Sequence, residues 1–125
     1  MKNKPKILLL ESDKVYADIL RKRMIEKKYQ VKIISSIEEA RKTLEHTSYH
    51  LFLFDIAVNQ DSGRAFFEDI EKEKTLILPP IIILTDHADR ETIQKMMAYG
   101  VKAYFLKKQT HISSILKKII EVLEN

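Results

Sequence analysis

The 125-residue sequence contains no cysteine and no tryptophan, and only two glycines and three prolines. The absence of cysteine excludes disulfide bonds and thiolate metal sites, and nothing indicates secretion. No Walker or GxGxxG pattern occurs, so nucleotide-binding loops of those two kinds are excluded. The apolar stretch that follows the basic start, Ile7 to Leu10, is too short for a signal-peptide core or a membrane span. We therefore expect a cytoplasmic protein with no membrane contact.

The composition is that of one globular domain, which we expect over residues 1–125. Hydrophobic residues make up 45% and charged residues 32%, and the net charge of +4 comes from 22 basic and 18 acidic residues. The densest basic stretch, Arg21-Lys22-Arg23 with Lys27-Lys28, falls on a predicted helix, where such residues commonly form a solvated face. No nucleic-acid-binding module is present, so we expect no direct nucleic-acid partner.

Five apolar runs alternate with five helix-like segments. The predicted strands are Lys6–Leu10, Val31–Ile34, Leu51–Phe54, Ile81–Leu84 and Ala103–Leu106. The predicted helices are Lys14–Lys28, Ser36–Thr47, about Gly63 to Lys72, Arg90–Tyr99 and Ile112–Leu123. Strands that alternate with helices in this way predict an α/β fold, with a parallel sheet covered by helices on both faces.

Local signals support these boundaries. Ser36 with Glu39 predicts a capping box, and Gly100 follows the fourth helix where a left-handed C-cap is favoured. Apolar stripes at helical spacing support the first and last helices: Val15, Ile19, Leu20 and Met24 in the first, and Ile112, Ile115, Leu116, Ile119 and Leu123 in the last.

Three chemically active residues directly follow three of the predicted strands. Asp55 follows LFLF, Thr85 follows IIIL and Lys107 follows AYFL. In parallel sheets the functional crevice lies outside the carboxyl ends of the strands. A carboxylate, a hydroxyl and an ammonium at one rim suit phosphoryl chemistry, because the carboxylate can attack phosphorus while the other two hold its oxygens.

The motifs around these residues resemble the receiver domain of two-component response regulators over essentially the whole chain. They are KILLLESD, LFLFDIAVNQDSG, IIILTD and GVKAYFLK. The resemblance implies a flavodoxin-like, doubly wound, five-stranded parallel sheet of order 2-1-3-4-5 with five helices. It further implies that Asp55 is the phosphoacceptor, that Thr85 and Lys107 hold the phosphoryl oxygens, and that Tyr104 is the switch aromatic. Tyr104 is equally a half-buried strand aromatic by its position.

The resemblance also implies a cofactor and partners. The cofactor is Mg²⁺, bound by the side chains of Glu11 and Asp55 and by the backbone carbonyl of Ala57. The phosphodonor is a sensor histidine kinase or a phosphotransfer protein. The output domain or partner protein is expected to dock on the fourth helix, fifth strand and fifth helix, and homodimerisation stays open. Such a domain signals by protein contact and has no turnover substrate, so we do not expect an enzyme.

Four positions depart from the family pattern. Ser12 replaces the second acidic residue, which removes a metal ligand and predicts weak Mg²⁺ binding, while Asp13 is expected to face away at the start of the first helix. Asp86 replaces a small residue. It can repel the phosphoryl group, act as a substitute metal ligand, or turn to solvent and cap the next turn.

Lys108 replaces a proline that usually follows a cis bond, which predicts a trans peptide, and Asn59 replaces a loop proline. Because Ser12, Asp86 and Lys108 all touch the same site, a second hypothesis remains. The chain could be a pseudo-receiver, an interaction module that works without phosphorylation.

Overall fold

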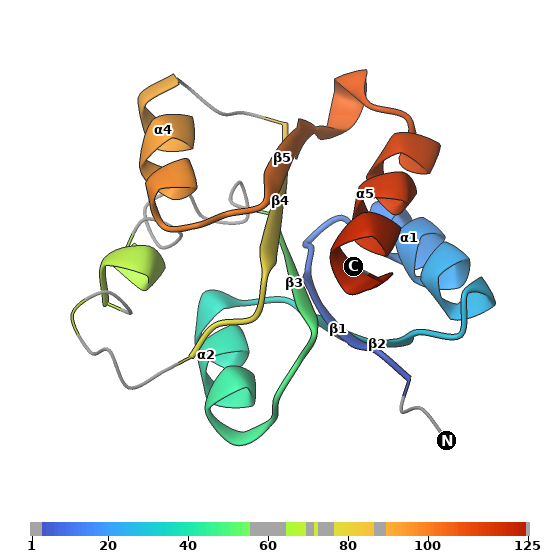
Figure 1. Ribbon diagram of the computed structural model, residues 1–125, viewed down its shortest axis with the longest axis horizontal. Helices are drawn as coiled ribbons and strands as arrows, with labels where there is room; N and C mark the ends of the chain where they lie inside the picture. The colour runs from blue at the N-terminus through green and yellow to red at the C-terminus, as the bar shows by residue number, and fades with distance from the viewer. Residues whose placement is uncertain (1–3, 56–64, 70–71, 73–76, 87–89, 125) are drawn as a thin grey trace.

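The computed structural model covers residues 1–125 and describes residues 4–55, 65–69, 72, 77–86 and 90–124. Its core is a sheet of five parallel strands in the order β2-β1-β3-β4-β5 (Figure 1). The strands are β1 (Lys6–Leu10), β2 (Gln30–Ile34), β3 (Leu51–Asp55), β4 (Ile81–Thr85) and β5 (Ala103–Leu106). The predicted fold class and strand order are therefore confirmed.

Helices cover both faces of the sheet. Helices α1 (Lys14–Glu26) and α5 (Ile112–Glu124) lie on one face, and α2 (Ile37–His46) and α4 (Arg90–Ala98) lie on the other (Figure 1). Residues 65–69 are helical on the α2 side, and a short 3₁₀ turn, η2 (Lys107–Gln109), follows β5. None of the helices in the described ranges has the length and apolar character that a membrane span requires.

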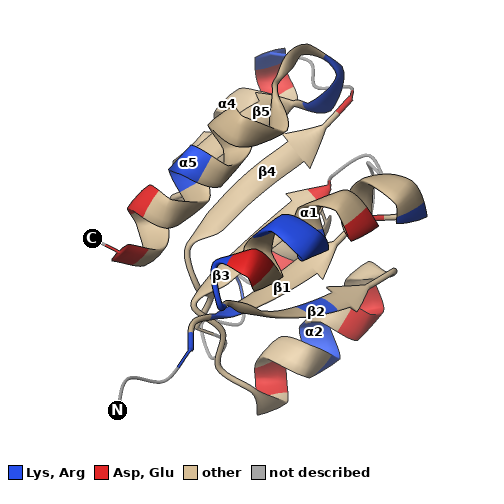
Figure 2. Ribbon diagram, turned by 90° about the vertical axis from the view of Figure 1, so that its right-hand side faces the viewer, with Lys and Arg blue, Asp and Glu red and all other residues tan. Residues whose placement is uncertain are grey.

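The strands bury alternate side chains in two core layers. In β1, Leu8 and Leu10 belong to the layer beneath α2 and α4, while Ile7 and Leu9 belong to the layer beneath α1 and α5. This two-sided burial explains why the strands are continuous apolar runs. Charged residues are correspondingly concentrated on the helices, with few on the strands (Figure 2).

The caps predicted for the helices are confirmed, whereas the helix bounds differ from the predicted ones by one or two residues, and the start predicted for the third helix, at about Gly63, lies outside the described residues. The Ser36 hydroxyl accepts a hydrogen bond from the Glu39 N–H at 3.1 Å, and Glu39 accepts one from the Ser35 N–H at 3.1 Å. Ser36 and Thr47 are therefore caps of α2 and not helical residues. Gly100 has a φ of +88° just after α4, the left-handed conformation that the sequence predicts there.

The apolar stripe predicted for α1 is partly wrong. Val15 is 71% exposed and Ile19 is 43% exposed, whereas α1 packs on the sheet through three other positions, Ala17, Leu20 and Met24. These three lie at the spacing i, i+3 and i+7 of one helical face. A small residue, Ala17, lets α1 lie close to the sheet, and an apolar stripe chosen by side-chain size alone overlooks it.

Candidate functional site

The register between β1 and β3 brings two carboxylates together. Leu10 is paired with Phe54 in the parallel ladder. Glu11 and Asp55, the residues that follow this pair in sequence, therefore lie at the same edge of the sheet. Both are buried, with 3% and 2% of their surface exposed. Two buried acids at one strand edge require a cation close by.

The register between β4 and β5 brings a hydroxyl and an ammonium to the same edge. Asp55 is paired with Leu84, so Thr85 follows one step beyond it, fully buried. Thr85 in turn is paired with Leu106, and Lys107 follows. The carboxyl ends of four adjacent strands, β1, β3, β4 and β5, thus deliver Glu11, Asp55, Thr85 and Lys107 to one rim.

The Lys107 ammonium bridges the two carboxylates. Its Nζ donates to Asp55 Oδ2 at 2.9 Å and lies 2.9 and 3.0 Å from Glu11 Oε1 and Oε2. All three side chains are shielded from solvent: 8% of the lysine side chain is exposed, 0% of the glutamate and 3% of the aspartate. Charge-assisted hydrogen bonds of this kind are strong in a buried setting.

One ammonium cannot fully compensate two buried carboxylates. Burial raises the pKa of Glu11 to about 7, and the neighbouring Asp55 adds to this increase, while Lys107 and the Asp13 N–H act in the opposite direction. Burial alone would lower the pKa of Lys107, but its hydrogen bonds to Asp55 and Glu11 outweigh that effect and raise it above its ordinary value. The site therefore retains unbalanced negative character that an additional cation can offset.

Asp13 turns to the start of α1, as the sequence predicts. The Asp13 side chain caps α1 by accepting hydrogen bonds from the Val15 N–H at 3.0 Å and the Tyr16 N–H at 3.1 Å. Its own N–H donates to Glu11 Oε2 at 3.1 Å. Ser12 is exposed. Asp13 therefore serves the helix and does not replace the carboxylate that is missing at Ser12.

Tyr16 belongs to the site, although its sequence position gave no motif. Lys107 Nζ lies over the Tyr16 ring, 5.0 Å from its centroid. Burial raises the pKa of Tyr16 to about 12, and the charges of Lys107, Glu11, Asp86 and Asp55 all act on its hydroxyl. The sequence signal for this role was the presence of an aromatic residue in the first turn of the helix that follows β1, because that turn starts at the rim.

Two buried polar atoms of the site have no hydrogen-bond partner among the described residues, the Tyr16 hydroxyl and Asp86 Oδ1. The alternative in which Asp86 turns to solvent does not hold for this oxygen, because it is buried, while the cap that Asp86 could give the next turn concerns residues 87–89, outside the described residues. A buried carboxylate oxygen at the rim keeps open the other two alternatives for Asp86, repulsion of a phosphoryl group and interaction with a cation.

The remaining predicted residues have different outcomes. Ala57 and Asn59 lie outside the described residues. Lys108 belongs to η2, and the described chain contains no cis peptide bond, which confirms the predicted trans bond. Tyr104, on β5, is 40% exposed and therefore lies outward in this structure.

The donor set fits Mg²⁺. Proteins commonly hold this ion through one or two carboxylates, with water and phosphate oxygens as the other ligands. Glu11 and Asp55 provide two carboxylates that converge on one cation, the Lys107 ammonium. No group of three or more Asp, Glu, His or Cys side chains suited to a metal occurs in the described ranges. A site with two side-chain carboxylates is consistent with a weakly held ion.

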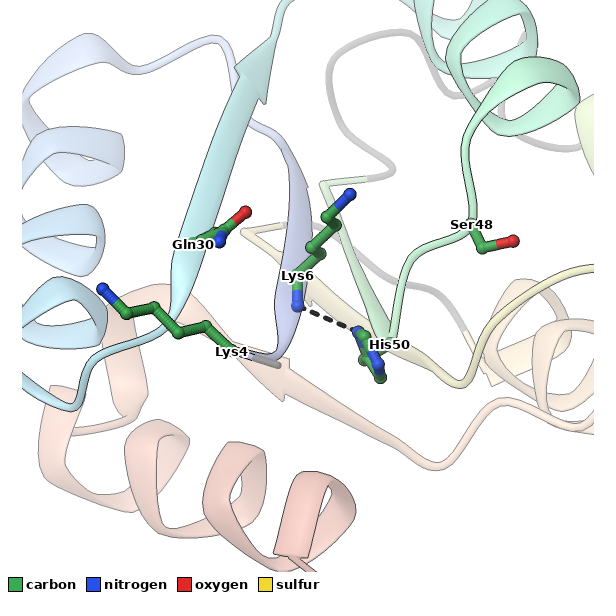
Figure 3. A pocket seen from close by; sticks show the side chains of 5 residues that line it. All are labelled: Lys4, Lys6, Gln30, Ser48 and His50. Carbon is green, nitrogen blue, oxygen red and sulfur yellow. Dashed lines mark hydrogen bonds between the residues drawn. The ribbon is translucent and has the colours of Figure 1, made fainter. Parts of the chain in front are cut away.

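A hollow at the opposite end of the sheet has different chemistry. It has a volume of about 420 Å³ and is lined by Lys4, Lys6, Gln30, Ser48 and His50 (Figure 3). The Lys6 backbone N–H donates to His50 Nδ1 at 2.9 Å, so the imidazole closes the amino end of β1. No carboxylate is among the described residues that line this hollow, whereas the acidic rim brings together Glu11, Asp55, Thr85 and Lys107.

Comparison with known proteins decides the family. The sequence model described as response regulator receiver domain matches residues 7–120. The chain belongs to this family. It is a receiver domain of a two-component response regulator. As a group, receiver domains are signalling modules that generally bind Mg²⁺ at their acidic pocket.

Individual relatives agree with this assignment. The chain is 29% identical over 104 residues to "Putative two-component response regulator-like APRR4" from Arabidopsis thaliana, covering 82% of this chain and 35% of that protein. The chain thus spans about a third of this relative. A CheY-like receiver domain protein from Methanospirillum hungatei JF-1 superposes with a TM-score of 0.84 at 24% identity, covering 98% and 95% of the two chains. A two-component response regulator from Clostridium difficile gives 0.83 at 20% identity, covering 98% of each. At these identities the superpositions show the fold alone.

Proposed function

We propose that this receiver is phosphorylated on Asp55 and signals through protein contact. The observation that carries the proposal is the buried Asp55 carboxylate, held by the Lys107 ammonium at 2.9 Å beside Glu11. A fixed nucleophile next to a fixed positive charge is what phosphoryl transfer requires, since most of the catalysis is positioning and charge stabilisation.

The proposed chemistry is an in-line displacement. An Asp55 oxygen forms a bond to phosphorus while the bond from phosphorus to the donor's imidazole nitrogen breaks, and that nitrogen leaves with its electron pair. The ammonium of Lys107 and the hydroxyl of Thr85 hold two phosphoryl oxygens. Glu11 and Asp55, with the Ala57 carbonyl, would hold Mg²⁺, which supplies further neutralisation of the phosphoryl charge. Hydrolysis of the acyl phosphate returns the carboxylate.

The output surface we propose is formed by α4, β5 and α5. Two large apolar side chains are exposed on this part of the molecule, Met97 on α4 at 43% and Tyr104 on β5 at 40%. An exposed aromatic and a flexible methionine are favourable elements of a protein interface. The phosphodonor is a histidine kinase or phosphotransfer protein, and Tyr104 would change its rotamer when Thr85 moves toward a phosphorylated Asp55.

Intact-mass spectrometry tests the phosphoacceptor. Incubation with acetyl phosphate and Mg²⁺ should add one phosphoryl group, slowly, because Ser12 removes one metal ligand. The Asp55→Asn variant should show no adduct, whereas Asp69→Asn, on the exposed residue that pairs with Arg41, should react like the wild type. An adduct that persists in Asp55→Asn would refute the assignment.

The second candidate is a pseudo-receiver, an interaction module that is never phosphorylated. The exposed Ser12 and the buried Asp86 oxygen favour it, because one removes a metal ligand and the other places negative charge at the rim. Beryllofluoride with Mg²⁺ separates the two functions. A phosphorylatable receiver should show amide shifts at Thr85, Tyr104 and α4, whereas a pseudo-receiver should show an unchanged spectrum at millimolar concentrations.

Ser12→Asp should tighten Mg²⁺ binding. Ser12 follows Glu11 directly, and a third carboxylate close to a divalent cation should contribute at least about 1 kcal/mol, roughly fivefold in Kd. Because the chain has no tryptophan, calorimetry or amide shifts replace indole quenching. Ser48→Asp, at an exposed position at the opposite end of the sheet, serves as the matched control. Equal Kd values for Ser12→Asp and the wild type would mean that Asp86 already fills the role or that the pocket is closed to the ion.

A further inference from the structure

We propose that Tyr16 is a positioning residue of the phosphoryl site: its ring holds the Lys107 ammonium, and its hydroxyl donates a hydrogen bond to a phosphoryl oxygen carried by Asp55. This inference rests on the function proposed above. It adds a residue whose position in the sequence suggested no role, and it assigns a use to a buried hydroxyl that has no partner among the described residues.

The position of Tyr16 is fixed by the helix that carries it. Helix α1 begins at Lys14, three residues after Glu11, and Asp13 caps it by accepting from the Tyr16 N–H at 3.1 Å. The same Asp13 donates its own N–H to Glu11 Oε2 at 3.1 Å. The cap therefore links the backbone of Tyr16, through Asp13, to the Glu11 carboxylate, so that the aromatic ring stands at the rim in a defined place.

The ring completes the surroundings of the ammonium. Lys107 Nζ carries three N–H groups, and the carboxylates of Glu11 and Asp55 accept from it on one side. Nζ also lies over the Tyr16 ring, 5.0 Å from its centroid, within the range of a cation–π interaction. A lysine side chain has a flexible four-carbon stem. A third contact restricts where its charge can go.

The Tyr16 hydroxyl is a buried donor with no acceptor among the described residues. A buried O–H without a hydrogen bond is unfavourable, and the groups whose charges act on it are Lys107, Glu11, Asp86 and Asp55. It therefore lies among the charges of the site. Burial raises its pKa to about 12, so it keeps its proton at neutral pH and can only gain by meeting an acceptor. Phosphoryl oxygens are strong acceptors, and Asp55 would bring them to this place.

Three variants separate the ring from the hydroxyl. Tyr16→Phe keeps the ring and removes the hydroxyl, whereas Tyr16→Leu removes both. Tyr49→Phe is the matched control, because Tyr49 is also partly buried, with its pKa raised by burial alone, but packs on the opposite face of the sheet. All three are compared with the wild type by NMR titration with beryllofluoride at fixed Mg²⁺. In the ligand-free proteins, the exchange of the Lys107 ammonium protons with water is measured as well.

Tyr16→Phe should weaken beryllofluoride binding about tenfold to a hundredfold, as expected for the loss of one hydrogen bond to a charged acceptor, and leave ammonium exchange unchanged. Tyr16→Leu should weaken binding further and accelerate ammonium exchange, and Tyr49→Phe should change neither. If the wild type binds beryllofluoride and Tyr16→Phe binds it with the same Kd, the role of the hydroxyl is overturned while the proposed function stands. Unchanged ammonium exchange in Tyr16→Leu overturns the ring's role. Failure of the wild type to bind overturns both the inference and the proposed function.

Discussion

The free energy of unfolding of the metal-free protein should fall by about 3 kcal/mol as the pH rises from 4.5 to 7, because of Glu11 alone. Burial, reinforced by Asp55, raises the pKa of Glu11 from 4.5 to about 7 in the folded protein. Between these two values the folded state holds a proton that the unfolded state has lost. Raising the pH therefore favours unfolding across this interval, and the effect levels off above it.

The other rim residues with shifted pKa values, Lys107 and Tyr16, do not change the pH dependence of stability between pH 4.5 and 7. The pKa of Lys107 is raised above an ordinary value of 10.5, so its contribution to stability is complete below that pH and is lost only above it. The pKa of Tyr16 is raised from 10.0, so the destabilisation that follows from its burial also begins only in alkali. Glu11 is thus the buried group of the rim that sets the slope near neutrality.

Urea unfolding at several pH values, with a chelator present, measures this effect. Glu11→Gln has nearly the same shape and does not titrate. Groups remote from the rim contribute equally to both proteins, so the difference in slope reports Glu11 together with its interactions with Asp55 and Lys107. Asp55→Asn should reduce the slope without abolishing it, since burial, the larger cause, remains. Parallel pH profiles for the wild type and Glu11→Gln would contradict the raised pKa.

The sheet could be predicted closely because its strands are bounded by polar residues. The predicted ranges for β1 and β5 are confirmed, and β3 and β4 each extend one residue further, to Asp55 and Thr85. In β2 the structure begins one residue earlier, at Gln30, because that residue pairs with Lys6 of β1. The start of β2 is determined by its pairing with β1, so it cannot be predicted from the residues of the segment alone.

The site was less accessible from the sequence because it depends on side-chain direction. The strand-end positions of Asp55, Thr85 and Lys107 follow from the apolar runs before them. The sharing of one ammonium by two carboxylates, however, depends on the reach of the lysine stem from the end of β5 past β4 to the ends of β3 and β1. The role of Tyr16 could not be predicted from the sequence for the same reason. Its spacing is that of an ordinary helix residue, and only the start of α1 at the rim brings its ring beneath Lys107.

Lys107→Met should destabilise the protein by about 3 kcal/mol or more at pH 8, above the raised pKa of Glu11. Methionine preserves most of the stem but leaves two buried carboxylates without their cation. At lower pH the loss should shrink, because Lys107 lowers the pKa of Glu11 and its removal lets Glu11 take up a proton more readily.

The same substitution at the surface provides the control. Lys118 pairs with Glu121 at 3.4 Å, and their side chains are 36% and 53% exposed. Lys118→Met should therefore cost less than about 1 kcal/mol. The double variant Lys107→Met with Glu11→Gln should recover part of the lost stability, because only one buried carboxylate then lacks a partner. A loss at Lys107 no larger than the loss at Lys118 would contradict the buried pairing.

Mg²⁺ distinguishes lost charge balance from lost packing in Lys107→Met. Removal of the ammonium frees the two carboxylates that converge on it, so the folded variant should bind Mg²⁺ more tightly than the wild type. An ion that binds only the folded state stabilises it by about 1.4 kcal/mol at ten times its Kd. Stability should rise with Mg²⁺ in Lys107→Met and much less in the double variant with Glu11→Gln. If Mg²⁺ leaves Lys107→Met unchanged, Glu11 and Asp55 do not form a common cation site, and the proposed metal ligands would have to be sought elsewhere at the rim.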